Sequence, residues 1–283
     1  MNCKNCNQPL SKEAHFCNNC GAKVVLNRID FKNLLLDFFI VNFGVDSRFF
    51  LTIRKMATHP EDVLNEYLEG VRRRYVNPFA FLAVGAALSL IIFNYFADDF
   101  IAIQSNVNSE NIEHLKKAAE KDVEKTEGLS EKEVKKLKIE KKTAQFQLDL
   151  MESMWDFMLR YFNLLTFVFL LIYAVLSKWT FWKPHNFGEH IVMNGYIYGF
   201  TTYITLIAFF FAIVIHPTIY IATFFISIVY YMYAFGRFYK LSIGRNIIKL
   251  FRFFIGLIIL FILFVIITVV LGIIAGATGL IKF

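Results

Sequence analysis

Residues 67–81, which read Tyr-Leu-Glu-Gly-Val-Arg-Arg-Arg-Tyr-Val-Asn-Pro-Phe-Ala-Phe, divide the chain into two chemically different parts. Before them lies a polar region that holds all four cysteines, and after them come long uncharged apolar runs of bilayer length. Arg72, Arg73 and Arg74 stand directly before the first of these runs. Because a Lys/Arg cluster beside a first span is retained in the cytoplasm, the sequence predicts a membrane protein whose N-terminus is inside.

The composition supports this prediction. Of the 283 residues 57% are hydrophobic and 33 are phenylalanine, which is too apolar for an ordinary soluble domain. The net charge of +7 comes largely from Lys and Arg beside the apolar runs, where basic residues set orientation and meet anionic headgroups. We therefore expect membrane lipid, and not nucleic acid, as a partner. The polar first twenty residues do not have the pattern of a secretory signal peptide.

Five transmembrane helices are predicted, at residues 78–97, 161–177, 191–215, 218–236 and 253–276, the last four within a region spanning 157–283. Lys178 and Lys183 follow the second helix, and five further Lys or Arg residues follow the fourth, within 237–252. The turn His216-Pro217 between the third and fourth helices carries no Lys or Arg. Five crossings place every basic loop in the cytoplasm and the C-terminus outside. The expected fold is an all-α polytopic membrane protein.

The two polar segments around the first span are predicted to be helical as well. Residues 26–77 contain short amphipathic stretches, which could lie in the headgroup plane or pack against the bundle. Within them, Thr58 and Glu61 have the spacing of a helix start. Residues 98–156 are rich in Lys and Glu and predict an extracytoplasmic helical hairpin, self-packed or pairing with another subunit in a homo-oligomer. Ser130 and Glu133 have capping-box spacing for its second helix, which can continue into the second span.

Residues 1–25 have the pattern of a metal-binding module. Cys3 and Cys6, and likewise Cys17 and Cys20, form Cys-x-x-Cys pairs, and Gly21 follows the second pair. Four thiolates favour tetrahedral zinc, with iron as the alternative. Four cysteines leave no open coordination position, so the expected role of the metal is structural and not catalytic.

The cysteine pattern, with Phe16-Cys-Asn-Asn-Cys-Gly, resembles the small zinc ribbon at the N-termini of many bacterial membrane proteins. The stretches at 31–38, 46–52 and 66–79, together with Pro60, resemble an uncharacterised domain-of-unknown-function membrane family of Bacteroidota. The resemblance covers about residues 1–82. The resemblance implies this architecture and a bacterial origin, and hence a bacterial inner membrane, but it implies no activity.

Polar residues recur at helical spacing in the third and fourth spans. The third carries His190, Asn194, Tyr198, Thr201 and Thr205, and the fourth carries Tyr220, Thr223, Ser227 and Tyr230 or Tyr231. Because their connection is short, the two helices should be antiparallel neighbours whose polar faces meet each other or a shared cavity. The pattern fits interhelical hydrogen bonding or a path for a substrate.

The central portions of the spans contain no Asp, Glu, Lys or Arg, which argues against a proton- or sodium-coupled pump. His185, Glu189 and His190 are the candidates for a catalytic set, but their spacing differs from that of the metalloprotease helix motif, so an enzyme is not expected. The sequence favours a scaffold or accessory protein whose cytosolic zinc ribbon contacts other proteins. The alternative is a channel or carrier for a small neutral or lipidic solute through the polar face of the third and fourth spans.

Overall fold

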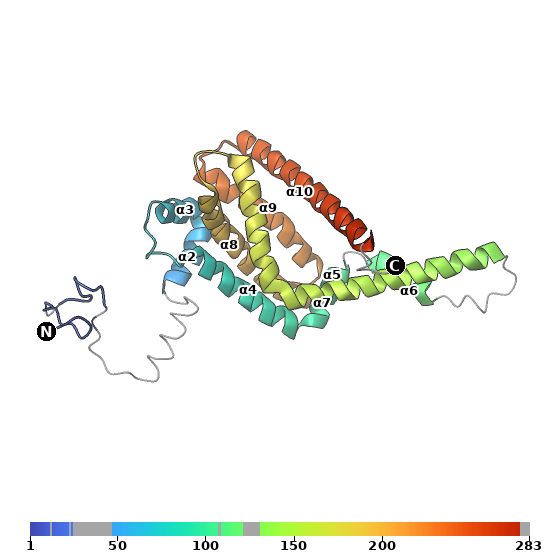
Figure 1. The fold of residues 1–283 in the computed structure, drawn as a ribbon, viewed down its shortest axis with the longest axis horizontal. Coiled ribbons are helices and arrows are strands. Elements are labelled where there is room, and N and C mark those ends of the chain that lie inside the picture. Colours follow the sequence, from blue (N-terminus) through green and yellow to red (C-terminus); the bar gives the residue numbers. More distant parts are fainter. Residues whose placement is uncertain (12, 23, 25–46, 107–108, 121–130, 278–283) are drawn as a thin grey trace. The chain divides into compact units, whose positions relative to one another are not determined.

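The structure, a computed structural model, describes residues 1–11, 13–22, 24, 47–106, 109–120 and 131–277. The chain divides into two compact units, Met1–Phe43 and Gly44–Phe283. The first holds the cysteines, and the second is helical (Figure 1). The helices are α2 (Ser47–Thr58), α3 (Pro60–Leu68), α4 (Pro78–Tyr95), α5 (Ala97–Asn106), α6 (Ser109–Glu120), α7 (Glu131–Phe181), α8 (Phe187–Val214), α9 (Thr218–Phe238) and α10 (Ile243–Ala277).

Five of the described helices, α4, α7, α8, α9 and α10, are long and apolar enough to cross a membrane. This agrees with the five predicted spans, although α7, α8 and α10 begin before the predicted starts and α4 ends two residues before the predicted end. α7 continues from the polar insert into the second apolar run, as expected. α10 begins at Ile243, so Arg245, Lys249 and Arg252 lie on this helix. The sequence had predicted these residues in the loop after the fourth span, and that prediction was wrong.

The centre of the second unit is the contact between α4 and α8. Gly195 and Gly199 lie one turn apart on α8, and both face α4. A Cβ atom at Gly195 would stand 3.0 Å from Pro78, and one at Gly199 would stand 2.8 Å from the Phe81 ring. The two backbones can approach this closely because neither glycine has a side chain.

α2 and α3 pack on α8 and α9, so for residues 47–68 the structure has the second of the two alternatives, packing against the bundle. Phe49, Met56, Val63, Leu64 and Tyr67 are buried in one hydrophobic cluster with residues of α4, α8 and α9. Thr58 does not cap α3, because its hydroxyl donates to the Arg54 carbonyl within α2, and the N-cap of α3 is His59. Residues 26–46 lie outside the described part.

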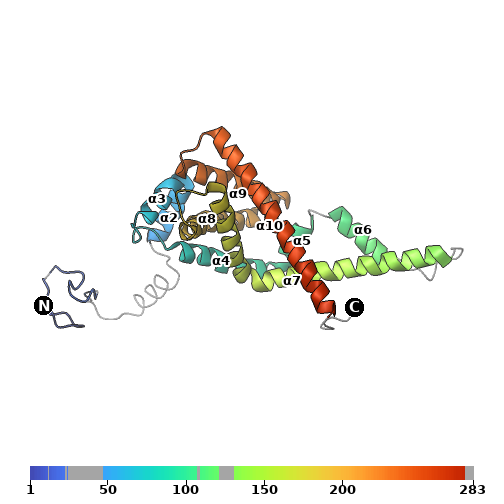
Figure 2. The ribbon, with the colours of Figure 1, turned by 45° about the horizontal axis from the view of Figure 1, so that its top comes forward.

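A second hydrophobic cluster lies at the other end of α8 and includes Phe93, Phe100, Leu206 and Phe209. Phe100 belongs to α5, so the insert after α4 begins with a helix that packs back on the bundle, and only α6 and α7 form the hairpin. Figures 1 and 2 both show α7 turning part-way along its length, and Tyr161 has non-helical dihedrals there (φ −107°, ψ 16°). Ser130, the predicted cap, lies outside the described residues.

Candidate functional site

A cavity of about 820 Å³ lies between α7, α8, α9 and α10, with α4 contributing Ser89 and Phe93. Its lining includes Ile197 of the first hydrophobic cluster and Phe93 of the second, so it is bordered by both. Most of the lining side chains are aliphatic or aromatic. Ligand sites in proteins typically have this volume and this largely apolar character.

The polar residues of α8 and α9 divide between the cavity and its surroundings. Those that line the cavity are Asn194, Tyr198, Thr201, Thr205, Tyr220 and Ser227. Thr223 is buried outside the lining, where its hydroxyl donates to the Tyr220 carbonyl at 2.5 Å. His190 is also buried outside the lining. Thr202, Tyr173 and Tyr231 also line the cavity.

The threonine hydroxyls are engaged within their own helix. Thr201 donates to the Tyr198 carbonyl at 2.9 Å, and Thr205 donates to the Thr201 carbonyl at 3.0 Å. Each proton is therefore used, and only the oxygen lone pairs of these groups remain to face the cavity. Side-chain to backbone bonds of this kind are common in helices and explain part of the polar stripe without a ligand.

Tyr231 differs from the threonines. Its hydroxyl oxygen is buried and has no hydrogen-bond partner among the described residues. The ring packs against Phe235 and Phe253, with centroid separations of 4.6 and 4.9 Å. An unpartnered buried hydroxyl costs roughly 1–3 kcal/mol. Because this oxygen is covered by protein atoms, Tyr231 lines the cavity with its ring and not with its hydroxyl.

A buried hydrogen-bond network borders the cavity at Asn194. The Asn194 amide donates to Ser177 Oγ and to the His190 carbonyl, both at 2.7 Å. Ser177 Oγ lies 2.9 Å from His190 Nδ1, whereas His190 Nε2 has no partner among the described residues. Ser177 was not anticipated from the sequence, because a single hydroxyl in an apolar run has no periodic signature.

The residues considered for catalysis have separate partners. Glu189 and Asn186 form a capping box: the Asn186 backbone donates to the Glu189 carboxylate at 2.6 Å, and the Glu189 backbone donates to the Asn186 side chain at 3.0 Å. His185 Nδ1 lies 3.2 Å from the Tyr239 hydroxyl. Helix capping accounts for the position of Glu189.

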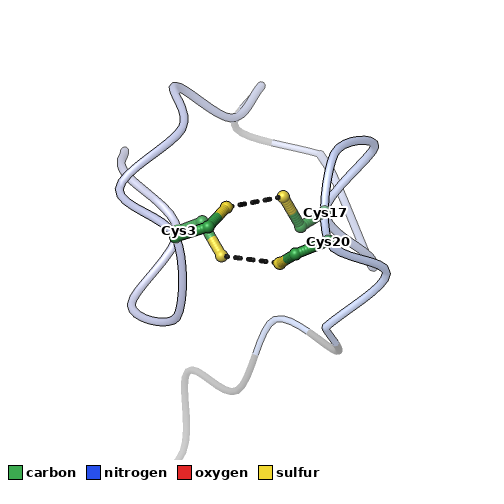
Figure 3. A group of neighbouring side chains, drawn as sticks. Cys3, Cys17 and Cys20 are labelled. Atoms are coloured by element: carbon green, nitrogen blue, oxygen red, sulfur yellow. Dashed lines mark hydrogen bonds between the residues drawn. The ribbon is translucent and has the colours of Figure 1, made fainter.

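The four cysteines converge on one point in the first unit (Figure 3). Their sulfur atoms all lie within 4.8 Å of one another, with Cys3 to Cys20 at 3.7 Å and Cys6 to Cys17 at 3.5 Å. Four sulfurs around a zinc ion at about 2.3 Å stand roughly 3.8 Å apart in tetrahedral geometry. The donor set and its spacing therefore fit a tetrahedral metal site.

Both knuckles have the same backbone design. The residue after each pair, Asn7 or Gly21, adopts positive φ, at 59° and 70°. In each case its N–H donates at 2.9 Å to the carbonyl of the first cysteine of the pair, Cys3 or Cys17. Asn and Gly are the residues that tolerate this conformation most readily. The Asn5 side chain and the Ala22 N–H lower the pKa of Cys20 to about 6, which favours its thiolate, whereas the neighbouring cysteine side chains contribute to raising the pKa of Cys6 to about 11.

Within the second unit, side-chain hydrogen bonds join the segment from α2 to α4 to α8 and α9. The Tyr196 hydroxyl donates to the Val76 carbonyl at 2.6 Å, and Arg237 Nε donates to Glu61 at 2.9 Å. Burial, together with the hydrogen bond to Glu66, raises the pKa of Tyr75 to about 12.

This segment is also the part with a known counterpart. Residues 46–90 match the model of a family described as "Protein of unknown function (DUF3667)". No curated protein and no solved structure matches the chain. The match covers α2, α3 and the first part of α4, so the similarity to this family concerns the segment packed on α8 and α9.

Proposed function

We propose that the protein binds a small neutral or lipidic solute inside the membrane, in the cavity between α7, α8, α9 and α10, and acts as its carrier. The observation that carries the proposal is the cavity itself, about 820 Å³ and bordered by four membrane-length helices.

The lining indicates a neutral solute. No Asp, Glu, Lys or Arg is among the described residues that line the cavity. An ion at this depth would need a charged or strongly polar partner, because desolvation of a charge in hydrocarbon is costly. Hydroxyl groups of the lining, such as those of Tyr173 and Tyr220, suit a neutral polar group.

The proposed setting is a bacterial inner membrane, with the N-terminus in the cytoplasm and the hairpin of α6 and α7 outside. The basic residues beside the spans support this orientation. In it, the four cysteines form a cytosolic zinc ribbon, and zinc stabilises a segment too short to hold a hydrophobic core.

Filling the cavity tests the proposal. Ser227→Trp places a large side chain in the wall, whereas Thr268→Trp makes a similar change at an exposed position of α10. The wild type and Thr268→Trp should retain lipid-like molecules from the host membrane in native mass spectrometry, and Ser227→Trp should lose them. Circular dichroism and thermal unfolding verify folding. Equal retention by a folded Ser227→Trp variant would refute the proposal.

A second candidate function, scaffold or accessory protein, is favoured by one surface. Ile139, Phe146, Leu150 and Phe157 of α7 recur at intervals of seven, four and seven residues, and their side chains are 49–64% exposed. These four residues lie on one face of α7. Ala144 lies on a different face and is buried. A second copy of the chain, lying parallel in the same membrane, would bring this stripe against its own equivalent at the same height.

The oligomer can be detected in native membranes. A photoreactive amino acid at Phe146 should yield a crosslinked dimer, and the same group at Asp149, on another face of α7, should not. Absence of crosslinks from Phe146, or equal yields from both positions, would count against this second candidate. Crosslinks to a different protein would show that this protein covers the stripe, and would refute the proposal that a second copy of the chain does so.

A further inference from the structure

Positive charge gathers at the end of the bundle where α7 and α9 finish and α8 and α10 begin. Between residues 178 and 252 the chain has one acidic residue, Glu189, and seven basic ones: Lys178, Lys183, Arg237, Lys240, Arg245, Lys249 and Arg252. Glu189 belongs to the capping box of α8, and Arg237 pairs with Glu61 of α3. The remaining basic residues form no ion pair with a residue that the structure describes, so most of this charge lacks a counter-charge there.

Two of the lysines stabilise the end of α7, whose last carbonyl groups have no partner within the helix. Lys249 reaches across from α10 and donates to the Thr180 carbonyl at 2.8 Å. Lys178 donates to the carbonyl groups of Trp182 and His185, just beyond the helix. Positive charge is favourable at a helix C-terminus, where the carbonyl groups are partly negative. Helix capping therefore accounts for Lys178 and for one N–H donor of Lys249.

Helix capping does not account for Arg252. The centre of its guanidinium group lies 4.9 Å from the centroid of the Trp179 ring, and no described residue offers it an acceptor oxygen. An aromatic ring attracts a cation but accepts no conventional hydrogen bond, so the N–H donors of Arg252 remain free to bind an anion. Arg245 and Lys249 lie seven and three residues before Arg252, on the same face of α10. Because like charges on one helix face repel, an anion bound here would relieve the repulsion.

Exposed apolar side chains continue from this cluster along both helices, which are in contact with each other. Val175 lies one turn before Trp179 on α7, and Ile255 lies about one turn after Arg252 on α10; both are exposed. The two helices are of membrane length, so these side chains face hydrocarbon. Tryptophan is typical of the level where hydrocarbon meets the headgroups. The cations therefore lie at headgroup level, with apolar surface next to them.

These surroundings favour a phosphate group that is attached to a lipid. Arginine can bind a phosphate through two parallel hydrogen bonds, and lysine adds a point charge. A soluble phosphate would leave Val175 and Ile255 uncovered, whereas the acyl chains of a phospholipid would cover them. A zwitterionic headgroup would add an ammonium group to a place that already has excess positive charge. The headgroup should therefore have a net negative charge.

We infer that the junction of α7 and α10 is a binding site for an anionic phospholipid. Its phosphate lies between Arg252 and Lys249, and its acyl chains follow Val175 and Ile255. The site is separate from the cavity, because neither Arg252 nor Lys249 is among the residues that line the cavity. The inference rests on the membrane-length helices and does not depend on the proposed function.

Two lipids with the same acyl chains test the headgroup: dioleoyl phosphatidylglycerol and dioleoyl phosphatidylcholine. Native mass spectrometry of the full-length protein in detergent measures the binding of each as its concentration is raised. Phosphatidylglycerol should bind at least about fivefold more tightly, the preference expected from one or two nearby cations. Equal binding of the two lipids would overturn the inference.

The Arg252→Gln variant tests the site. It should weaken phosphatidylglycerol binding about tenfold, the effect of one lost charge-assisted hydrogen bond, and should leave phosphatidylcholine binding unchanged. Arg73→Gln is the matched control, because Arg73 is exposed before α4 and likewise forms no ion pair with a described residue. Equal losses in the two variants would mean that net charge alone attracts the lipid. The ratio between the two lipids does not change if Arg252→Gln only weakens the packing on Trp179.

Two further measurements test the source of the phosphate and its place. Glycerol phosphate in large excess should not displace the lipid, and displacement would identify a soluble phosphate compound as the ligand and refute the lipid. Phosphatidylglycerol with a diazirine on its acyl chain, in phosphatidylcholine nanodiscs, should label the regions around Val175 and Ile255 more than the region around Val229, which is exposed on α9. Equal labelling of these regions, or labelling that Arg252→Gln leaves unchanged, would rule out a site at this junction.

Discussion

The hydroxyl of Tyr230 donates a 2.7 Å hydrogen bond to the backbone carbonyl of Met56, which lies 174 residues earlier in the chain. Met56 is in the last turn of α2, where a helix leaves its carbonyl groups without intrahelical partners. It belongs to the segment that matches the DUF3667 family, and Tyr230 is the neighbour of Tyr231 in the cavity wall. One side chain thus joins the family-matched segment to a helix of the candidate site.

Tyr230→Phe should destabilise the fold by about 1–3 kcal/mol, because it leaves the buried Met56 carbonyl unpaired. Thermal unfolding of the detergent-solubilised protein measures the loss. Tyr233→Phe is a suitable comparison, since its 2.7 Å bond to the Thr58 carbonyl is at an exposed site where water can replace the hydroxyl. The Tyr233 variant should lose less, and equal losses would contradict the importance of the Met56 bond.

Gly199→Ala should destabilise the contact between α4 and α8 by about 1–3 kcal/mol, because its Cβ would stand 2.8 Å from the Phe81 ring and force both helices to shift. Gly244→Ala makes the same change where nothing lies within 4 Å of the new atom. That variant should be neutral or stabilised by up to about 1 kcal/mol, as expected for alanine in a helix. Melting temperatures of both variants measure these changes. If Gly199→Ala is as stable as the wild type, α4 and α8 do not pack as closely as the structure indicates.

These glycines show how far a sequence motif can be interpreted. In the sequence, Gly272 and Gly276 have the small-xxx-small spacing that can let another helix approach closely, but their surroundings lie outside the described part. The structure instead has the close contact at Gly195 and Gly199. Spacing identifies a helix that can approach a neighbour, but not whether a neighbour lies on that face.

The apolar helices could be predicted because a bilayer requires about twenty uncharged residues for each crossing. Their ends could not. Hydropathy marks the part inside the hydrocarbon, whereas a helix continues for as long as its backbone bonds are satisfied. For this reason α10 begins ten residues before the predicted start at 253.

The polar stripe was predictable from helical periodicity, but the partners of its members were not. Thr223 and His190 follow the same spacing as Thr201, and yet they lie outside the cavity lining. Their side chains depend on the neighbouring helices, and Ser177 of α7 engages His190 across 13 residues of sequence. A periodic pattern predicts which residues share a helix face. The packing of neighbouring helices determines which of their polar groups find a hydrogen-bond partner.

Acid should weaken the contact between α2 and α3. The hydrogen bond from Lys55, at 2.9 Å, lowers the pKa of Asp62 below its ordinary value of 3.8. A folded-state pKa below the unfolded one gives stability that is present above about pH 4 and is lost as the pH falls through the folded-state pKa. The two side chains are 27% and 38% exposed, so solvent screens the pair and the effect should be small.

The comparison of wild type with Asp62→Asn across pH measures this contribution. The difference in melting temperature should be largest near neutral pH and should shrink below about pH 4. Glu113→Gln removes the carboxylate of an ion pair on α6 that is 74% and 67% exposed, and should have no measurable effect. A difference for Asp62→Asn that does not change with pH would exclude the ion pair as its cause.

Metal content should depend on each cysteine. The sulfur separations of 3.5 and 3.7 Å suit one tetrahedral ion, so the wild type should bind one zinc per chain and Cys17→Ser should bind none or bind it weakly. Asn18→Ser, which changes the neighbouring residue without removing a thiolate, should keep the metal. Elemental analysis of the purified protein measures the zinc content.

Zinc chelation should unfold the first unit, because metal binding and folding are coupled in such modules. Since the helices from α2 onward form a separate compact unit, their melting temperature should not change when zinc is removed. Iron in place of zinc would keep the site and change the metal, whereas full metal content in Cys17→Ser would disprove the four-thiolate centre.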